Sequence, residues 1–325
     1  MIQVGDLFDH YQIQAHVAQG GMSDIYSAHD LLTGRTVALK IPNETMIGDP
    51  AQFERFRREL QVMNTLQHPA IQRGLGSGQF NRTPYLVTEW VEGSSLRTLI
   101  QAKAPLPSEE ATDLVRKIAE AMAYCHDHGV IDRDLKPENI LITPEGQPVI
   151  LDFGLALTAD ARRVTYANLS AVAGTPDYMA PEQVEGQRGD QRTDIYALGT
   201  IFYELLAGKT PFGGDNNLAV MAQHVQGILP RLDRERPGIS PQLAAIVARC
   251  LQRNPEERFQ DMHALIAALD HPETVDLTVL DKLAGPRAGG RFWHSQAFAA
   301  IVISLLVMAL IVVIALVAQK LRGAA

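Results

Sequence analysis

Residues 130–154 hold the side chains of this chain that are best suited to chemistry: two carboxylates, a lysine and an amide. Their types suit metal-assisted transfer of a phosphoryl group, in which positioning and charge neutralisation do most of the catalysis. Asp134 could take the proton from an attacking hydroxyl, and Lys136 could neutralise the moving phosphate. Asn139 and Asp152 offer the hard oxygen ligands that Mg²⁺ needs.

A hairpin is predicted to bring these side chains together. The apolar run 140–142, the turn T-P-E-G at 143–146 and the apolar run 149–151 indicate two short antiparallel strands. We therefore expect the hairpin to return Asp152 to a position beside Asn139.

The first ninety residues are typical of a small sheet with one helix. Alternating or apolar runs predict strands over 11–17, 25–29, 36–41 and 85–91. Residues 51–66 instead place their apolar side chains on one face of a helix.

Helices dominate the rest of the chain. A long helix is predicted from Ser108, as its N-cap, to about residue 128, where Gly129 closes it before the loop of the candidate base. Further helices are predicted over 194–208 and 241–252.

The order of these motifs resembles the eukaryotic-like (Hanks-type) serine/threonine protein kinases, and among them the bacterial membrane-anchored kind. The resemblance covers about residues 8–270. It rests on V-A-L-K at 37–40, D-R-D-L-K-P-E-N at 132–139, D-F-G at 152–154 and A-P-E at 180–182.

The resemblance implies an α+β bilobal protein-kinase fold, with a small antiparallel β-rich N-lobe over about 8–92 and a larger helical C-lobe over about 93–270. Residues 271–296 read as a juxtamembrane linker. Residues 297–318 are almost all aliphatic and, at about 1.5 Å per residue, would cover roughly 33 Å, enough to cross a bilayer core of about 30 Å. A short tail, 319–325, follows.

The family also implies an ATP site. Glu59 would orient the ammonium of Lys40 toward the α- and β-phosphates, and the backbone of Glu89 and Val91 would bind adenine. The full set implied for the nucleotide is Val17, Ala18, Gly20, Ser23, Ile25, Ala38, Lys40, Glu59, Thr88, Glu89, Val91 and Leu141. Mg²⁺ is the expected metal, with Mn²⁺ as an alternative.

Regulation is expected in the segment 154–182. Ser170 is the first candidate phosphosite and Thr165 the second, and Arg133 would receive the phosphate. Thr175, a third candidate hydroxyl, would instead bond the base and its lysine as part of the substrate platform.

Two further roles carried over from the family are architectural. Asp194 would brace the backbone of the catalytic loop, and Arg258 would pair with Glu182 of the A-P-E motif.

The composition of the chain limits the number of domains and the classes of function that it could have. A chain of 325 residues with 46% hydrophobic content holds one two-lobed domain or two ordinary ones. The formal charge of −8 argues against a nucleic-acid binder. Cys125 and Cys250 are expected to be buried free thiols in a reducing compartment. No signal peptide is visible at the start.

The reading that follows is a serine/threonine protein kinase that acts on protein substrates, autophosphorylates in its activation segment and signals from the cell membrane. It would be single-pass, with the kinase domain in the cytoplasm, where ATP is found, and it could form a homodimer.

Two other readings compete with an active protein kinase. The alternative is a membrane-anchored pseudokinase that acts as a binding or scaffold module. It draws on three departures from the family pattern: Ala18 and Ser23 replace loop glycines, and Asp132 replaces a histidine. A small-molecule phosphotransferase is disfavoured because it would not need the long activation segment.

Overall fold

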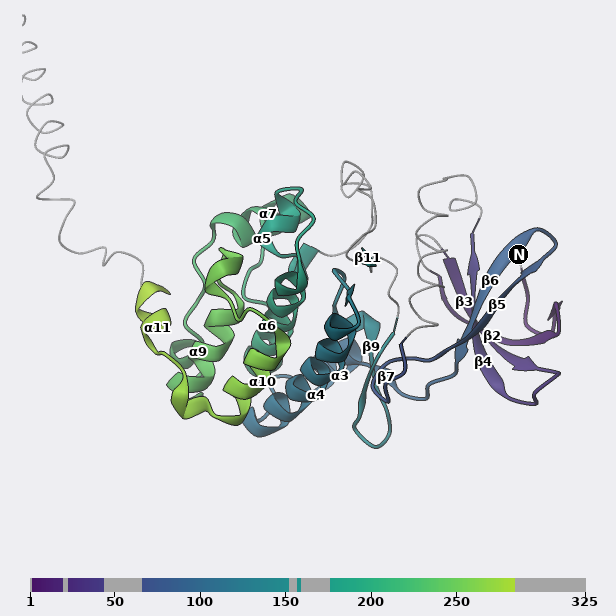
Figure 1. Ribbon diagram of the computed structural model, residues 1–325, viewed down its shortest axis with the longest axis horizontal. Coiled ribbons are helices and arrows are strands. Elements are labelled where there is room, and N and C mark those ends of the chain that lie inside the picture. The colour runs from purple at the N-terminus through teal and green to yellow at the C-terminus, as the bar shows by residue number, and fades with distance from the viewer. Residues whose placement is uncertain (1, 20–22, 44–65, 152–156, 159–175, 284–325) are drawn as a thin grey trace, which may run out of the picture. The chain divides into compact units, whose positions relative to one another are not determined.

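The computed structural model describes residues 2–19, 23–43, 66–151, 157–158 and 176–283 (Figure 1). The chain forms two compact units, residues 1–280 and 281–325. All of the motifs that could do chemistry lie in the first unit.

A six-stranded sheet, ordered β1-β2-β3-β4-β6-β5, forms the N-terminal part. Each neighbouring pair is antiparallel, as the resemblance to the kinase family implied. The strands are β1 (Leu7–Phe8), β2 (Tyr11–Gln19), β3 (Ser23–Asp30), β4 (Thr36–Pro42), β5 (Gly74–Phe80) and β6 (Thr83–Glu89). The four predicted strands are confirmed, with ends that differ by one or two residues in most cases.

One face of this sheet buries an aromatic cluster. The ring of Tyr85 meets those of Phe8 and Tyr11 edge-on, with centroids 5.5 and 5.7 Å away. The Tyr85 hydroxyl donates to Asp9. Gly78 faces Tyr85 across β5 and β6, and a Cβ at Gly78 would overlap the tyrosine hydroxyl, so glycine is required there.

Helix α6 (Gln191–Ala207) forms the centre of the C-terminal part, because it is buried almost along its whole length. Helices α4 (Ser108–Asp127) and α9 (Pro241–Cys250) pack against it, and α10 (Met262–Asp270) packs on α4 (Figure 1). The other α-helices are α3 (Leu96–Lys103), α5 (Pro181–Val184), α7 (Asn217–Gln226), α8 (Leu232–Glu235) and α11 (Thr278–Leu283). The three predicted helices of this part are thus confirmed, within a few residues at each end.

Short elements complete the fold. They are the strands β7 (Ser94–Ser95), β8 (Val130–Ile131), β9 (Ile140–Ile142), β10 (Pro148–Ile150) and β11 (Leu157–Thr158), and the 3₁₀ helices η1 (Pro137–Asn139), η3 (Pro176–Tyr178), η4 (Pro255–Glu257) and η5 (Pro272–Thr274).

The N-terminus of α4 differs from the prediction by one residue. Ser108 is already helical, and Pro107 is the N-cap, with no side-chain hydrogen bond. The carbonyl of Pro107 instead accepts the amide of Ala111, which begins the helical ladder. At the other end, Gly129 follows His128 in the left-handed region (φ 73°), as a closing glycine should.

Both cysteines are free and buried, as expected. Burial raises the pKa of the Cys250 thiol to about 12, and burial together with the charges of Asp132 and Asp194 raises the pKa of Cys125. Neither thiol is therefore a nucleophile near neutral pH.

No helix in the described parts of the chain is both long and apolar enough to cross a bilayer. The predicted span 297–318, the second half of the linker before it (284–296), the tail after it and nearly all of the predicted helix 51–66 lie outside the described residues.

Candidate active site

The loop between β8 and β9 carries the candidate base, and the fold fixes both of its ends. β8 pairs with β11, and β9 pairs with β10 so that Leu141 faces Val149. The amide of Leu151 donates to the carbonyl of Asn139 at 2.8 Å. The predicted hairpin is confirmed, and it brings the chain back to Asn139 one residue before Asp152, which itself lies outside the described residues.

A lysine and a carboxylate meet within this loop. The ammonium of Lys136 lies 2.6 Å from Oδ2 of Asp134, and both side chains are partly exposed. Such a charge-assisted contact places a cation beside the candidate base, where a phosphoryl group would need its charge neutralised.

Asn139 is oriented by the same loop. Its Nδ2 donates to the carbonyl of Asp134 at 3.2 Å, so the amide oxygen Oδ1 faces away from that bond. An amide oxygen is a hard ligand, and it suits a divalent cation such as Mg²⁺. The described part of the donor set therefore fits the metal.

A buried aspartate holds the backbone of the loop. Asp194, in the first turn of α6, accepts the amides of Asp132 at 3.0 Å and of Arg133 at 2.8 Å. Its Oδ2 also lies 2.8 Å from Nε2 of His126. Arg133 has a φ of 65°, which is unusual for a residue other than glycine, and these bonds hold it there. The predicted brace is confirmed.

The sheet aligns part of the predicted nucleotide set. Ala38 in β4 faces Thr88 in β6, and both are buried. Lys40 faces Ile25, which in turn faces Ala18. Of the other members, Ser23 is buried, Val17 is exposed and Leu141 is partly exposed in β9, while Gly20 and Glu59 lie outside the described residues.

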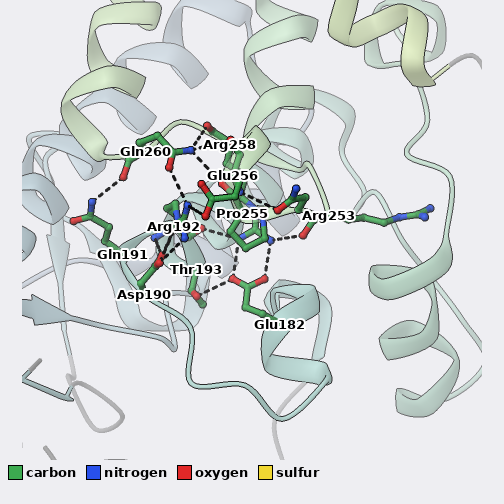
Figure 2. Close-up of polar contacts among 11 residues, drawn as sticks. Glu182, Asp190, Gln191, Arg192, Thr193, Arg253, Pro255, Glu256, Arg258 and Gln260 are labelled. Carbon is green, nitrogen blue, oxygen red and sulfur yellow. Dashed lines mark hydrogen bonds and ion pairs between the residues drawn. The ribbon is translucent and has the colours of Figure 1, made fainter.

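A buried ion pair ties distant parts of the C-terminal half together (Figure 2). The guanidinium of Arg258 donates to both carboxylate oxygens of Glu182, at 2.8 and 2.7 Å. Thr193 of α6 also donates to Glu182, at 2.9 Å, and the guanidinium lies over the ring of Tyr196. The predicted pairing of Arg258 with Glu182 is confirmed.

Comparison with known proteins agrees with this geometry. The family model "Protein kinase domain" matches residues 11–272. The chain belongs to the protein kinase family. Membership implies the use of ATP and a divalent metal.

The individual relatives that match are named serine/threonine-protein kinases. The chain is 37% identical over 259 residues to serine/threonine-protein kinase PknB of Mycobacterium leprae. The aligned region covers 78% of this chain and 41% of that protein. It is 36% identical to PknL of Mycobacterium tuberculosis (strain H37Rv), over 80% of this chain and 65% of that protein. A probable PknB of Lactococcus lactis is 33% identical over 87% of this chain. The chain spans less than half the length of the PknB relatives that it matches.

The end of β6 shows a contact that sequence reasoning missed. The carbonyl of Glu89, a residue whose backbone is predicted to bind adenine, accepts a hydrogen bond from Nε2 of Gln72 at 3.0 Å. A carbonyl oxygen has two lone pairs, so Gln72 occupies one of them. Nothing in the pattern around Gln72 marked it in advance. Val91, the other predicted adenine contact, lies two residues beyond the end of β6.

The kinase activation segment is largely outside the described residues, and with it Thr165, Ser170 and Thr175. The predicted phosphate receiver, Arg133, is buried, and its Nε donates to the carbonyl of Arg188 at 3.1 Å.

A buried histidine in α7 is expected to make the stability of the fold depend on pH. His224 in α7 lies against Phe212, and its Nδ1 is 2.8 Å from the hydroxyl of Tyr196. Burial lowers the pKa of His224 to about 4. Because the unfolded value is about 6.5, the unfolded state binds more protons between these values, and stability falls as pH drops from about 6.5 toward 4.

Between pH 7 and pH 4.5 the free energy of unfolding should fall in both the wild type and His224→Gln. We expect the fall to be smaller in His224→Gln, by about 2–3 kcal/mol. Urea unfolding at the two pH values measures this difference, and His263→Gln, at an exposed position, is the control. Equal losses in His224→Gln and the wild type would contradict the prediction.

Proposed function

We propose that the chain is an ATP-dependent serine/threonine protein kinase that transfers the γ-phosphoryl group to protein hydroxyls and autophosphorylates in its activation segment. The observation that carries this proposal is the 2.6 Å contact between Lys136 and Asp134, on a loop whose backbone is held by Asp194. The family and the names of the relatives support it.

In this proposal each residue of the catalytic loop has one task. Asp134 accepts the proton of the substrate hydroxyl, and Lys136 neutralises the transferring phosphate. Asn139 and Asp152 would hold Mg²⁺, which would help to neutralise the negative charge of the phosphate groups. Lys40, oriented by Glu59, would hold the α- and β-phosphates.

The same fold could serve a pseudokinase, and one assay separates the two. The full chain is incubated with Mg²⁺ and ATP labelled on the γ-phosphate, and the label is located by digestion. We expect label on serine or threonine, including residues between 159 and 175. A chain that binds nucleotide and acquires no label would be a pseudokinase instead.

We also propose that residues 297–318 anchor the enzyme in the cell membrane, with the kinase domain in the cytoplasm. The support is their aliphatic run, which is long enough to span a bilayer. The single span further suggests a homodimer that phosphorylates in trans. Autophosphorylation rates per molecule that stay constant across a wide dilution series would argue against that dimer.

The anchor can be tested with charges. Arginine near the centre of a transmembrane helix costs about 2.5–3.5 kcal/mol per residue, so Leu306→Arg with Leu310→Arg should move the full chain from the membrane to the soluble fraction. Leu306→Ala with Leu310→Ala is the matched control. A doubly charged chain that stays in the membrane after a carbonate wash would refute the anchor.

A further inference from the structure

Arg97, near the start of α3, lies at the centre of a polar cluster beside the catalytic loop. Its Nε donates to Oε1 of Glu138 at 2.8 Å, and its Nη1 donates to Oε1 of Glu204 at 2.8 Å. Its Nη2 donates to the hydroxyl of Tyr178, which donates in turn to the other oxygen of Glu204. One guanidinium therefore joins three separate segments of the fold.

Each partner of Arg97 comes from a part of the molecule that the proposed reaction uses. Glu138 lies in η1, four residues after Asp134 in the catalytic loop. Tyr178 lies in η3, within the stretch that leads from the activation segment to the A-P-E motif. Glu204 lies in α6. Because Glu138 follows Asp134 by only four residues, we expect a substrate whose hydroxyl reaches Asp134 to place its neighbouring residues near this cluster.

The cluster holds more negative than positive charge. Glu138 and Glu204, which we call the acidic pair, share the single guanidinium of Arg97. The carboxyl of Asp177 adds to the excess: burial raises its pKa first, and the negative charge of Glu204 raises it further, while Arg97 lowers it. Without Arg97, three carboxyl groups would stand together with no cation among these cluster residues.

One arginine can bind both carboxylates of the acidic pair, each 2.8 Å from its guanidinium, because a guanidinium offers five N–H donors in a rigid plane. Arg97 already uses three of them here. The two carboxylates differ in exposure. The side chain of Glu204 beneath Arg97 is only 8% exposed, whereas that of Arg97 is 23% exposed and that of Glu138 is 44% exposed. Arg97 thus takes the place that a basic side chain from outside would need.

We propose that Arg97 is a specificity-determining residue. It fills the acidic pair from the enzyme's own chain, so that a basic residue next to the phosphoacceptor brings the substrate no advantage. Removing the guanidinium opens the acidic pair and makes the enzyme select arginine. This inference rests on the proposed kinase function, and it deepens that function by naming the charge class of the substrate.

The test compares peptides that differ by one residue. Each carries a single phosphoacceptor and either arginine or alanine at one position between four residues before it and two after it. For the full-length wild type we expect the kcat/KM ratio of arginine to alanine to stay within about threefold at every position. For Arg97→Ala we expect a ratio of about tenfold or more at one position, the size of one charge-assisted hydrogen bond.

Two further variants control for folding and for cause. Arg97→Met removes the charge but keeps most of the aliphatic stem, so it should show the same gain in arginine preference. It replaces Arg97→Ala in the test if the alanine variant is poorly folded. Arg97→Met combined with Glu138→Gln should lose the gained preference. Arg116→Met, which removes an arginine paired only with exposed carboxylates of its own helix among the described contacts, should leave the ratios unchanged.

Three outcomes would overturn the inference. They are an arginine preference of tenfold in the wild type, unchanged ratios in a folded and active Arg97 variant, and a gain that persists in the double variant. The wild-type measurement needs no variant, so the inference stays testable if both substitutions at Arg97 prevent folding. A wild type that labels no peptide and not itself would instead count against the proposed function.

Discussion

Asp134→Asn should lower the rate of phosphoryl transfer by about 10²–10⁴-fold, the usual contribution of a general base, while nucleotide binding stays within about twofold. The amide keeps the shape of the carboxylate but cannot accept the proton of the attacking hydroxyl. It also loses the charge that holds Lys136 at 2.6 Å. The rate is measured by γ-phosphate incorporation, and binding by fluorescence titration with a nucleotide analogue.

Asp113→Asn is the matched control for this experiment. Asp113 is also a carboxylate paired with basic side chains, but it lies on the exposed face of α4, half exposed and next to Arg116 and Lys117. It should change neither rate nor binding. Full activity in Asp134→Asn would remove Asp134 as the base, and equal losses of binding and rate would instead indicate a folding defect.

Arg258→Met should destabilise the protein by about 3–5 kcal/mol, because it strands the buried carboxylate of Glu182 without its partner. For a domain of this size we expect the melting temperature to fall by about 10 °C. Glu182 also accepts a hydrogen bond from Thr193, but this single bond is too weak to replace a bidentate guanidinium. Calorimetry or circular dichroism at pH 7 measures the change.

A double variant separates a stranded charge from lost packing. Arg258→Met with Glu182→Gln removes both charges, so it should be more stable than Arg258→Met alone. Arg116→Met, at an exposed ion pair, should shift the melting temperature by no more than about 2 °C. A similarly small shift in Arg258→Met would show that the pair in Figure 2 adds little to stability.

Much of the fold could be predicted because its elements have local signals. Strand β2 begins with alternating apolar and polar residues, and β4 is a short apolar run. The β9–β10 hairpin has a turn sequence between two apolar runs, and α6 is largely apolar and has Gly208 as its C-cap. The end of α4 was found from Gly129, while its start was misplaced because a proline and a serine both suit the first positions of a helix.

The contacts that were missed join residues far apart in the chain. Arg97 meets Glu204 across 107 positions, and Gln72 meets Glu89 across 17. Arginine and glutamine near the start of a helix or strand are usually solvated, so neither residue stood out in the sequence. The pairing of Arg258 with Glu182 is equally long-range, and it was predicted only because the family motif named both partners.

Helix α6 supplies Asp194 to the catalytic loop, Thr193 to Glu182 and Glu204 to the cluster around Arg97. Damage to the packing of this one helix must therefore disturb the base, the A-P-E motif and the substrate side together. Such mutants should divide into a fully competent population and an incompetent one, so active-site titration would find fewer working molecules, each turning over at the normal speed.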